Sequence, residues 1–241
     1  MHLSESLFIS VIIVLCSICQ SIIGVGLVMI GIPTLILFGY SFELALSICL
    51  PGSLIINIFQ VSLQYKLYQK DDFSSYFIMS ITYLLFLFFV NLFLHITFNK
   101  ITAGIILILT GVVGCKIKTR DHFLSFLNKK TNITNFSIGI IHSISSLGGS
   151  VLSLAGAAKY NDSYESRRFI SGGYLSLGVI QLTFYLYHGV NIKPALYSFI
   201  AVPVYYLSSQ YVSPHINQHK LKSFIFTVIF IYGVLLISQS I

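Results

Sequence analysis

Uncharged apolar stretches alternate with short polar segments along the whole chain. Asp, Glu, Lys and Arg are all missing from residues 7–42, 44–65, 73–99, 101–115, 131–158, 169–192, 194–219 and 223–241. A helix of about 20 apolar residues crosses the roughly 30 Å hydrocarbon core of a bilayer. The stretches lack the alternation of barrel strands. The pattern therefore predicts an all-α polytopic membrane protein with about eight transmembrane helices.

Composition supports a chain that faces lipid. It is 56% hydrophobic and 9% charged, whereas soluble domains carry about 25% charged residues. No P-loop pattern occurs, so we expect neither ATP hydrolysis nor another enzymatic activity. We read the net charge of +7 as loop charge. No nucleic-acid partner is expected, and the localisation predicted is the cell membrane, multi-pass.

The first stretch is interrupted in its middle by Gly24, Gly26, Gly31 and Pro33. As one helix, residues 7–42 would be about 54 Å long, too long for a simple crossing. Glycine permits non-helical backbone, and proline disfavours helix at the residue before it. We therefore expect a broken or re-entrant first helix, with Gly31 and Pro33 as part of the structural break.

The chain divides into two similar halves. We predict a first four-helix repeat over residues 1–115, a basic cytoplasmic linker over 116–132 and a second four-helix repeat over 133–241. The linker assignment follows from the positive-inside rule and from Lys116, Lys118, Arg120, Lys129 and Lys130. Each half opens with an interrupted stretch, "IIGVGLVMIGIP" and "ISSLGGSVLSLAGAA", and an offset of 124 residues pairs Gly24 with Gly148. Duplicated interruptions are typical of secondary transporters whose binding site lies between the repeats.

The candidate binding residues are those near the two interruptions. A helix that restarts after a break presents free N–H groups and a positive dipole end, which suit an anion. Hydroxyl and amide side chains add hydrogen bonds. The candidates are Gly24, Gly26, Ser47, Asn57, Gly148, Gly149, Ser150, Ser171 and Gln181. Alternatively, these small and polar residues serve helix packing.

Three ionisable residues near the second interruption are further candidates for a role in transport. His142 lies three residues before the second interruption, where it could exchange a proton, hold an anion or act as a structural histidine. Arg167 and Arg168 lie at a polar mouth. They either attract anions or are ordinary helix-end residues whose charges extend to the interface.

The stretches "SIIGVGLVMIGIPTLILFGYSFELALSICLPGSL" and "FSIGIIHSISSLGGSVLSLAGAAKYNDSYESRRFISGGYLSLGVIQLTFYLYHG" resemble the TauE/SafE family, also called sulfite exporter-like or TSUP transporters. The family's glycine cluster, proline and following Ala/Ser-rich helix fall on Gly24, Gly26, Pro33, Gly39, Ala45 and Ser47, and in the second half on Gly148, Gly149 and Ser171. The resemblance implies export of sulfite, sulfonates or related organic anions, without ATP and with coupling to a proton or ion gradient.

Two other functions stay open. Cys16 and Cys19 form a C-x-x-C within an apolar stretch, so a membrane thiol-redox protein is one alternative, although cysteine also packs as a small hydrophobe. A non-transporting helical scaffold is the other. No metal site or cofactor is expected. The expected partners are a small anionic solute and the lipid bilayer, and a homo-oligomer is open.

Overall fold

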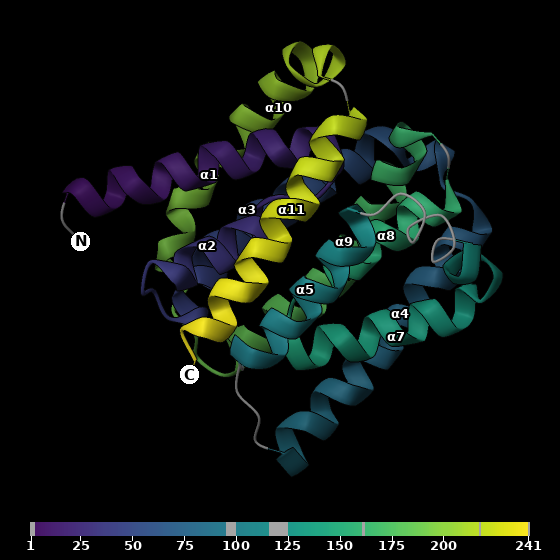
Figure 1. Cartoon of the computed structure of the whole chain (residues 1–241), viewed down its shortest axis with the longest axis horizontal. Helices are drawn as coiled ribbons and strands as arrows, with labels where there is room; N and C mark the ends of the chain where they lie inside the picture. The colour runs from purple at the N-terminus through teal and green to yellow at the C-terminus, as the bar shows by residue number, and fades with distance from the viewer. Residues whose placement is uncertain (1–2, 95–99, 116–124, 161, 217, 241) are drawn as a thin grey trace.

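The computed structural model describes residues 3–94, 100–115, 125–160, 162–216 and 218–240. Within these ranges every regular element is helical (Figure 1). In the same ranges four helices are long and apolar enough to cross a bilayer: Ser4–Ile23, Phe42–Leu67, Lys70–Leu92 and Tyr164–Tyr187. The predicted all-α class is confirmed for the described residues, and the four long apolar helices are compatible with a membrane protein.

The first half begins with a long helix and a broken continuation. Its elements are α1 (Leu3–Ile23), η1 (Leu27–Gly31), α2 (Ile32–Leu37), α3 (Phe42–Gln64), η2 (Tyr65–Leu67), α4 (Lys70–Phe89), η3 (Val90–Leu94) and α5 (Lys100–Cys115). Ser41 caps α3 by accepting a hydrogen bond from the Leu44 N–H at 3.2 Å, which satisfies one of the free donors of the first turn.

The second half begins with two shorter helices, α7 and α8, that are separated at residues 146–148 and followed by a longer helix. Its elements are α7 (Thr131–Ser145), α8 (Gly149–Lys159), α9 (Ser163–Tyr187), η4 (Lys193–Ile200), α10 (Ala201–Tyr211), η5 (Ser213–His215) and α11 (Gln218–Ser238). Asp162 caps α9 by accepting from the N–H groups of Tyr164 and Glu165.

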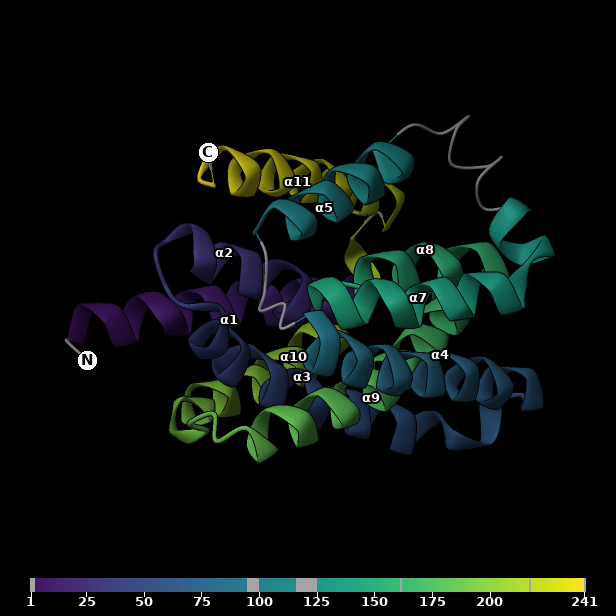
Figure 2. The same cartoon turned by 90° about the horizontal axis from the view of Figure 1, so that it is seen from below.

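The helices stack in three layers (Figure 2). α5 and α11 form one outer layer; α1, α2, α7 and α8 form the middle layer; α3, α4, α9 and α10 form the other outer layer. Across the halves, α5 packs on α11, α3 on α9, α4 on α7 and α1 on α10. The interrupted segments therefore lie between the two outer layers.

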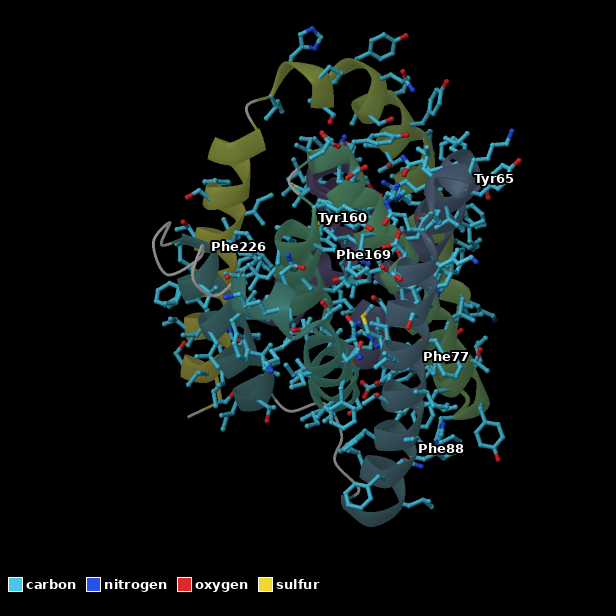
Figure 3. The ribbon with its side chains drawn as sticks, turned by 90° about the vertical axis from the view of Figure 1, so that its right-hand side faces the viewer. Tyr65, Phe77, Phe88, Tyr160, Phe169 and Phe226 are labelled. Carbon is cyan, nitrogen blue, oxygen red and sulfur yellow. The ribbon has the colours of Figure 1, made fainter. Side chains whose placement is uncertain are left out.

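The outer face of α4 is apolar. Phe77 is 69% exposed and Phe88 is 52% exposed, and both lie along this helix in Figure 3. Exposed phenylalanines at this density suit contact with lipid tails, because an apolar patch of this kind is rare on soluble monomers.

The position of the first break differs from part of the sequence expectation. The helix is interrupted at residues 24–26, while η1 runs directly into α2 through Gly31 and Pro33. Pro33 occupies the first turn of α2, where a missing N–H is tolerated and the fixed φ suits a helix. Gly31 and Pro33 mark the change from π to α geometry and do not break the chain direction.

The predicted linker lies partly outside the described residues. Residues 116–124, with Lys116, Lys118 and Arg120, belong to that undescribed part. Of the remainder, residues 125–129 are helical and Thr131 already begins α7.

Candidate functional site

The first interruption is a tight reversal of the chain after α1. Gly24 has φ +91°, a conformation that side chains disfavour. The Leu27 N–H donates to Oε1 of Gln20 at 3.1 Å, so a buried side chain satisfies a free donor of the restarted helix. Gly26 lies directly against α1, since a Cβ there would be 2.8 Å from the Gln20 backbone nitrogen.

The second interruption repeats this geometry after α7. Ser146 has φ +58°, and the Leu147 N–H donates to Oγ of Ser145 at 3.1 Å. A Cβ on Gly148 would lie 2.9 Å from the backbone nitrogen of His142. Gly148 therefore packs on the residue six positions earlier, as Gly26 does on Gln20. The positive-φ residues of the two turns are 122 residues apart, not the 124 expected from sequence.

A pocket of about 220 Å³ with a mixed polar and apolar lining opens beside the first break. We call it the first-break pocket; α1, α3, α9 and α10 line it with Ser21, Phe59, Gln60, Leu63, Gln64, Tyr164, Arg167, Tyr205, Tyr206, Ser209 and Gln210. Arg167 connects it to the break. Its guanidinium Nη1 donates to the Ser21 carbonyl at 2.8 Å and to Oγ of Ser213 at 3.1 Å.

The first-break pocket offers both donors and acceptors: Arg167 is the charged side chain in its lining, and Oε1 of the lining residue Gln64 is buried without a hydrogen-bond partner among the described residues. Gln60 is 5% exposed, and its Oε1 accepts from Oγ of Ser171 at 2.6 Å, which leaves the amide NH₂ as its remaining polar group. The buried Tyr205 also lines the pocket. Among the described residues no carboxylate lines this pocket or forms an ion pair with Arg167.

A second pocket, of about 290 Å³, opens beside the second break. This second-break pocket is lined by Phe42, Glu43, Leu87, Val90, Asn91, Ser143, Ile144, Ser146, Phe184, Tyr185, His188 and Val190. It uses the start of α3 and the end of α9, whereas the first-break pocket uses the end of α3 and the start of α9. The two pockets therefore lie at opposite ends of this helix pair.

Unpaired polar groups are buried near the second break. Neither ring nitrogen of His142 has a hydrogen-bond partner among the described residues, and the same is true of Oε1 and Nε2 of Gln181. The Gln181 amide lies beside the imidazole without normal hydrogen-bond geometry, and the Tyr83 ring packs edge-on at 4.7 Å between centroids. Unpaired buried polar groups cost stability, so this group is a functional candidate.

Arg168 belongs to a buried ion cluster, contrary to the expectation that it faces anions at a mouth. Asp72 is fully buried and accepts from Lys159 at 2.7 Å, from the Tyr160 hydroxyl at 2.5 Å and from Arg168 at 3.3 Å. Tyr160 and the adjoining Phe169 lie in the interior in Figure 3. The cluster joins the ends of α8, α4 and α9, because each contributes a charged or hydroxyl group.

Most of the residues predicted from the sequence lie around one of the two breaks, and two of them, Ser47 and Asn57, line neither break pocket. Gly24, Gly26 and Ser171 surround the first break: a Cβ on Gly24 would lie 3.3 Å from Arg167, and Ser171 bonds both Gln60 and the Arg167 carbonyl. His142, Gly148, Gly149, Ser150 and Gln181 lie around the second break and its neighbouring helices.

Ser47 and Asn57 lie on α3 outside both pockets. The Ser47 hydroxyl donates to the Leu44 carbonyl at 2.8 Å, a local helix bond, while Oδ1 of Asn57 is buried without a partner. Asn57 nevertheless lies on the part of α3 between Ser53, whose hydroxyl accepts from Nε2 of Gln20 at 3.4 Å, and Gln60, which lines the first-break pocket.

Sequence reasoning missed Gln20, Asp72, Tyr83 and Tyr205. Gln20 carries a signal, because it is an amide in an otherwise apolar stretch just before the glycines. Asp72 stands one residue outside an apolar stretch, so its burial was not visible. The tyrosines carry no local signal among the 15 of the chain.

The four cysteines are free thiols, and Cys16 and Cys49 are buried. Both flank Gly31, where a Cβ would lie 2.9 Å from Sγ of Cys49 and 3.5 Å from Sγ of Cys16. Within the described ranges no group of three or more His, Cys, Asp and Glu side chains is arranged to hold a metal ion.

Comparison of the chain with protein-family models, with curated proteins and with solved structures found no match.

Proposed function

We propose that this protein is a secondary transporter of small anions. The observation that carries the proposal is the pair of interrupted helices, each with a pocket beside its break, at opposite ends of α3 and α9. Interrupted helices in corresponding positions of two halves characterise transporters that expose a site alternately to the two sides. Non-helical backbone at membrane depth is tolerated where protein or a cavity satisfies it.

We also propose that the chain is built from two four-helix repeats with about eight membrane-crossing segments. Reciprocal packing supports this arrangement: α4 of the first half packs on α7, and α10 of the second half packs on α1. The shared glycine contacts at the two breaks support it further. α7 with α8, and η4 with α10, would each act as one interrupted segment, since none is long enough alone.

The orientation follows from the distribution of basic residues. Lys66, Lys70, Lys159 and Arg167 lie at the end of the α3–α9 pair that holds the first-break pocket, while Lys193 follows the opposite end. By the positive-inside rule we place the first-break pocket toward the cytoplasm. An exporter needs its loading site on that side.

The anionic substrate class rests on Arg167, which lines the first-break pocket without a carboxylate beside it among the described lining residues, and on the resemblance to the TauE/SafE family. Sulfite, sulfonates and small carboxylates are the candidates. We further propose His142 as the group that couples transport to protons, because it is a titratable side chain buried at the second break without a hydrogen-bond partner among the described residues. Histidine is the side chain whose ordinary titration falls in the physiological range.

Flux measurement in proteoliposomes tests the proposal. Purified protein is reconstituted, and uptake of radiolabelled sulfite, methanesulfonate and acetate is followed with and without a pH gradient, against protein-free liposomes. We expect saturable flux of at least one anion that responds to the gradient. If no anion moves faster than in protein-free liposomes under any gradient, the chain is not an anion transporter. That result would favour the alternative of a non-transporting helical scaffold.

A further inference from the structure

Arg167 is held in an unusual position for a basic residue at a helix end. One side of its guanidinium, Nη1, bonds the Ser21 carbonyl and the Ser213 hydroxyl. Its aliphatic stem packs on Gly24, since a Cβ there would meet Cα and Cγ of Arg167 at 3.3 Å. Arg167 thus touches the first break and the turn after α10 at the same time.

Arg167 also lines the first-break pocket. Its other nitrogens have no hydrogen bond to any described residue and no carboxylate partner. A guanidinium has five N–H donors in a planar fork that fits carboxylate, sulfonate or phosphate oxygens. An arginine in a pocket without a carboxylate lacks the counter-charge that a purely structural arginine would normally have.

Two buried side chains extend this donor set. Gln60 turns its oxygen to Ser171, so its NH₂ group remains for a ligand. Tyr205 is only 5% exposed and lines the same pocket. Its hydroxyl forms no hydrogen bond with a described residue. A cation, an amide and a hydroxyl around about 220 Å³ provide donors for a small oxyanion.

We propose that Arg167 is the residue that binds the transported anion, and that the bound anion takes the place of the Ser213 hydroxyl on the guanidinium. This inference rests on the proposed transport function and assigns its loading site. Because Nη1 also holds the Ser21 carbonyl at the end of α1, occupancy of the site is linked to the first break. Release of Ser213 frees the turn after α10 to move relative to α9.

Three variants test the assignment by their effect on the KM for sulfite flux. Arg167→Lys keeps the charge but loses the bidentate fork, and we expect KM to rise about tenfold or more. Gln60→Glu is nearly isosteric and places a negative charge in the pocket, so we expect a similar rise. Ser213→Ala removes the competing hydroxyl, and we expect KM to fall about 2- to 10-fold, the range of one net hydrogen bond.

Asn132→Asp serves as a matched control, because it adds a carboxylate on an exposed residue of α7 outside the pocket. Its KM should equal that of the wild type. If Arg167 only caps the carbonyl at the end of α1, Arg167→Lys will lower the melting temperature and leave KM unchanged. That outcome, or an unchanged KM in Gln60→Glu, overturns the assignment.

A chemical readout separates the binding site from transport. Phenylglyoxal modifies accessible arginine, and mass spectrometry locates the products. We expect modification of Arg167 in detergent and its protection by millimolar methanesulfonate, which does not react with the reagent, while the buried Arg168 stays unmodified. If the anion is transported but does not protect Arg167, the assigned binding site is wrong, while the proposed transport function still stands. Absence of flux for every anion refutes the proposed function itself.

Discussion

Gly148 lies against the backbone of His142, and a Cβ at Gly148 would come within 2.9 Å of the His142 nitrogen. The same relation joins Gly26 to Gln20 in the other half of the chain, at 2.8 Å. Each break therefore folds the restarted helix back onto the helix that it follows. A side chain on either glycine would have no room, because the contacting atoms are the backbone and the Cβ of the preceding helix.

Gly26→Ala and Gly148→Ala should each reduce transport strongly. The added methyl group must displace backbone, and overpacking of this kind costs about 1–3 kcal/mol. We expect a lower melting temperature in detergent and flux per folded molecule well below the wild type, measured in proteoliposomes with matched protein content.

Gly39→Ala is the control for these two substitutions. Gly39 has φ +90° but no heavy atom within 4 Å of the position of a Cβ. The variant suffers about 1 kcal/mol of conformational strain and no steric contact, so its flux should persist. Equal losses in all three variants would mean that the interruptions have no special role.

Asp72→Asn should destabilise the fold substantially. The substitution removes the carboxylate from Lys159 and Arg168, whose side chains are 18% and 3% exposed. Breaking a buried ion pair by removal of one partner costs about 3–5 kcal/mol, because the other charge stays buried and uncompensated. The melting temperature of the purified protein measures this effect.

Asp71→Asn is the neighbouring control, since Asp71 is exposed. We expect a change of melting temperature close to zero there, as is usual for surface charges. If Asp72→Asn melts like Asp71→Asn, the cluster does not stabilise the junction of α4, α8 and α9.

Sequence reasoning located the two breaks because glycine clusters in apolar stretches are local signals. Gly24, Gly26 and Gly148 lie in or next to the turns of the structure. The register between the halves could not be read correctly, since the glycines of the second turn are displaced and Ser146 takes the positive-φ position. A serine in that position has no sequence signature of its own.

The pockets were less predictable than the breaks, because they depend on which helices meet. Arg167 and Arg168 are adjacent in sequence, yet one lines a pocket and the other is buried against Asp72. Neighbouring positions on a helix point about 100° apart, so tertiary packing separates their roles. Gln60 and Tyr205 join Arg167 only through the packing of α3, α9 and α10.

Replacement of Cys16 and Cys19 by Ala should leave flux nearly unchanged. Burial disfavours the thiolate that redox chemistry requires, and Cys16 is buried. Removal of a sulfur from the packed interior lowers stability by about 1 kcal/mol or more. The measurement is flux under reducing and oxidising conditions, with Cys115→Ala as the control; an oxidant-sensitive activity that disappears with Cys16 and Cys19 would support the thiol-redox alternative.

His142→Gln should fold and should flatten the pH dependence of transport. Gln20 stands in the corresponding position of the first half, six residues before the packed glycine, so an amide is compatible with this geometry. The groups that face His142 are Tyr83 from α4 and Gln181 from α9, and neither is charged at neutral pH. If His142 carries the coupling proton, its removal abolishes the response of flux to pH.

The second-break pocket, whose lining does not include His142, carries the titratable side chains Glu43, Tyr185 and His188, and His188→Gln is the matched control. Its imidazole Nδ1 contacts the Phe184 carbonyl at 2.8 Å, and its side chain is exposed, so we expect a nearly wild-type pH profile. If the pH profile flattens in His188→Gln and persists in His142→Gln, His188 at the second-break pocket is the coupling residue, and the buried His142 is not. Such a result would leave the two breaks as the transport site, because their packing does not involve His188.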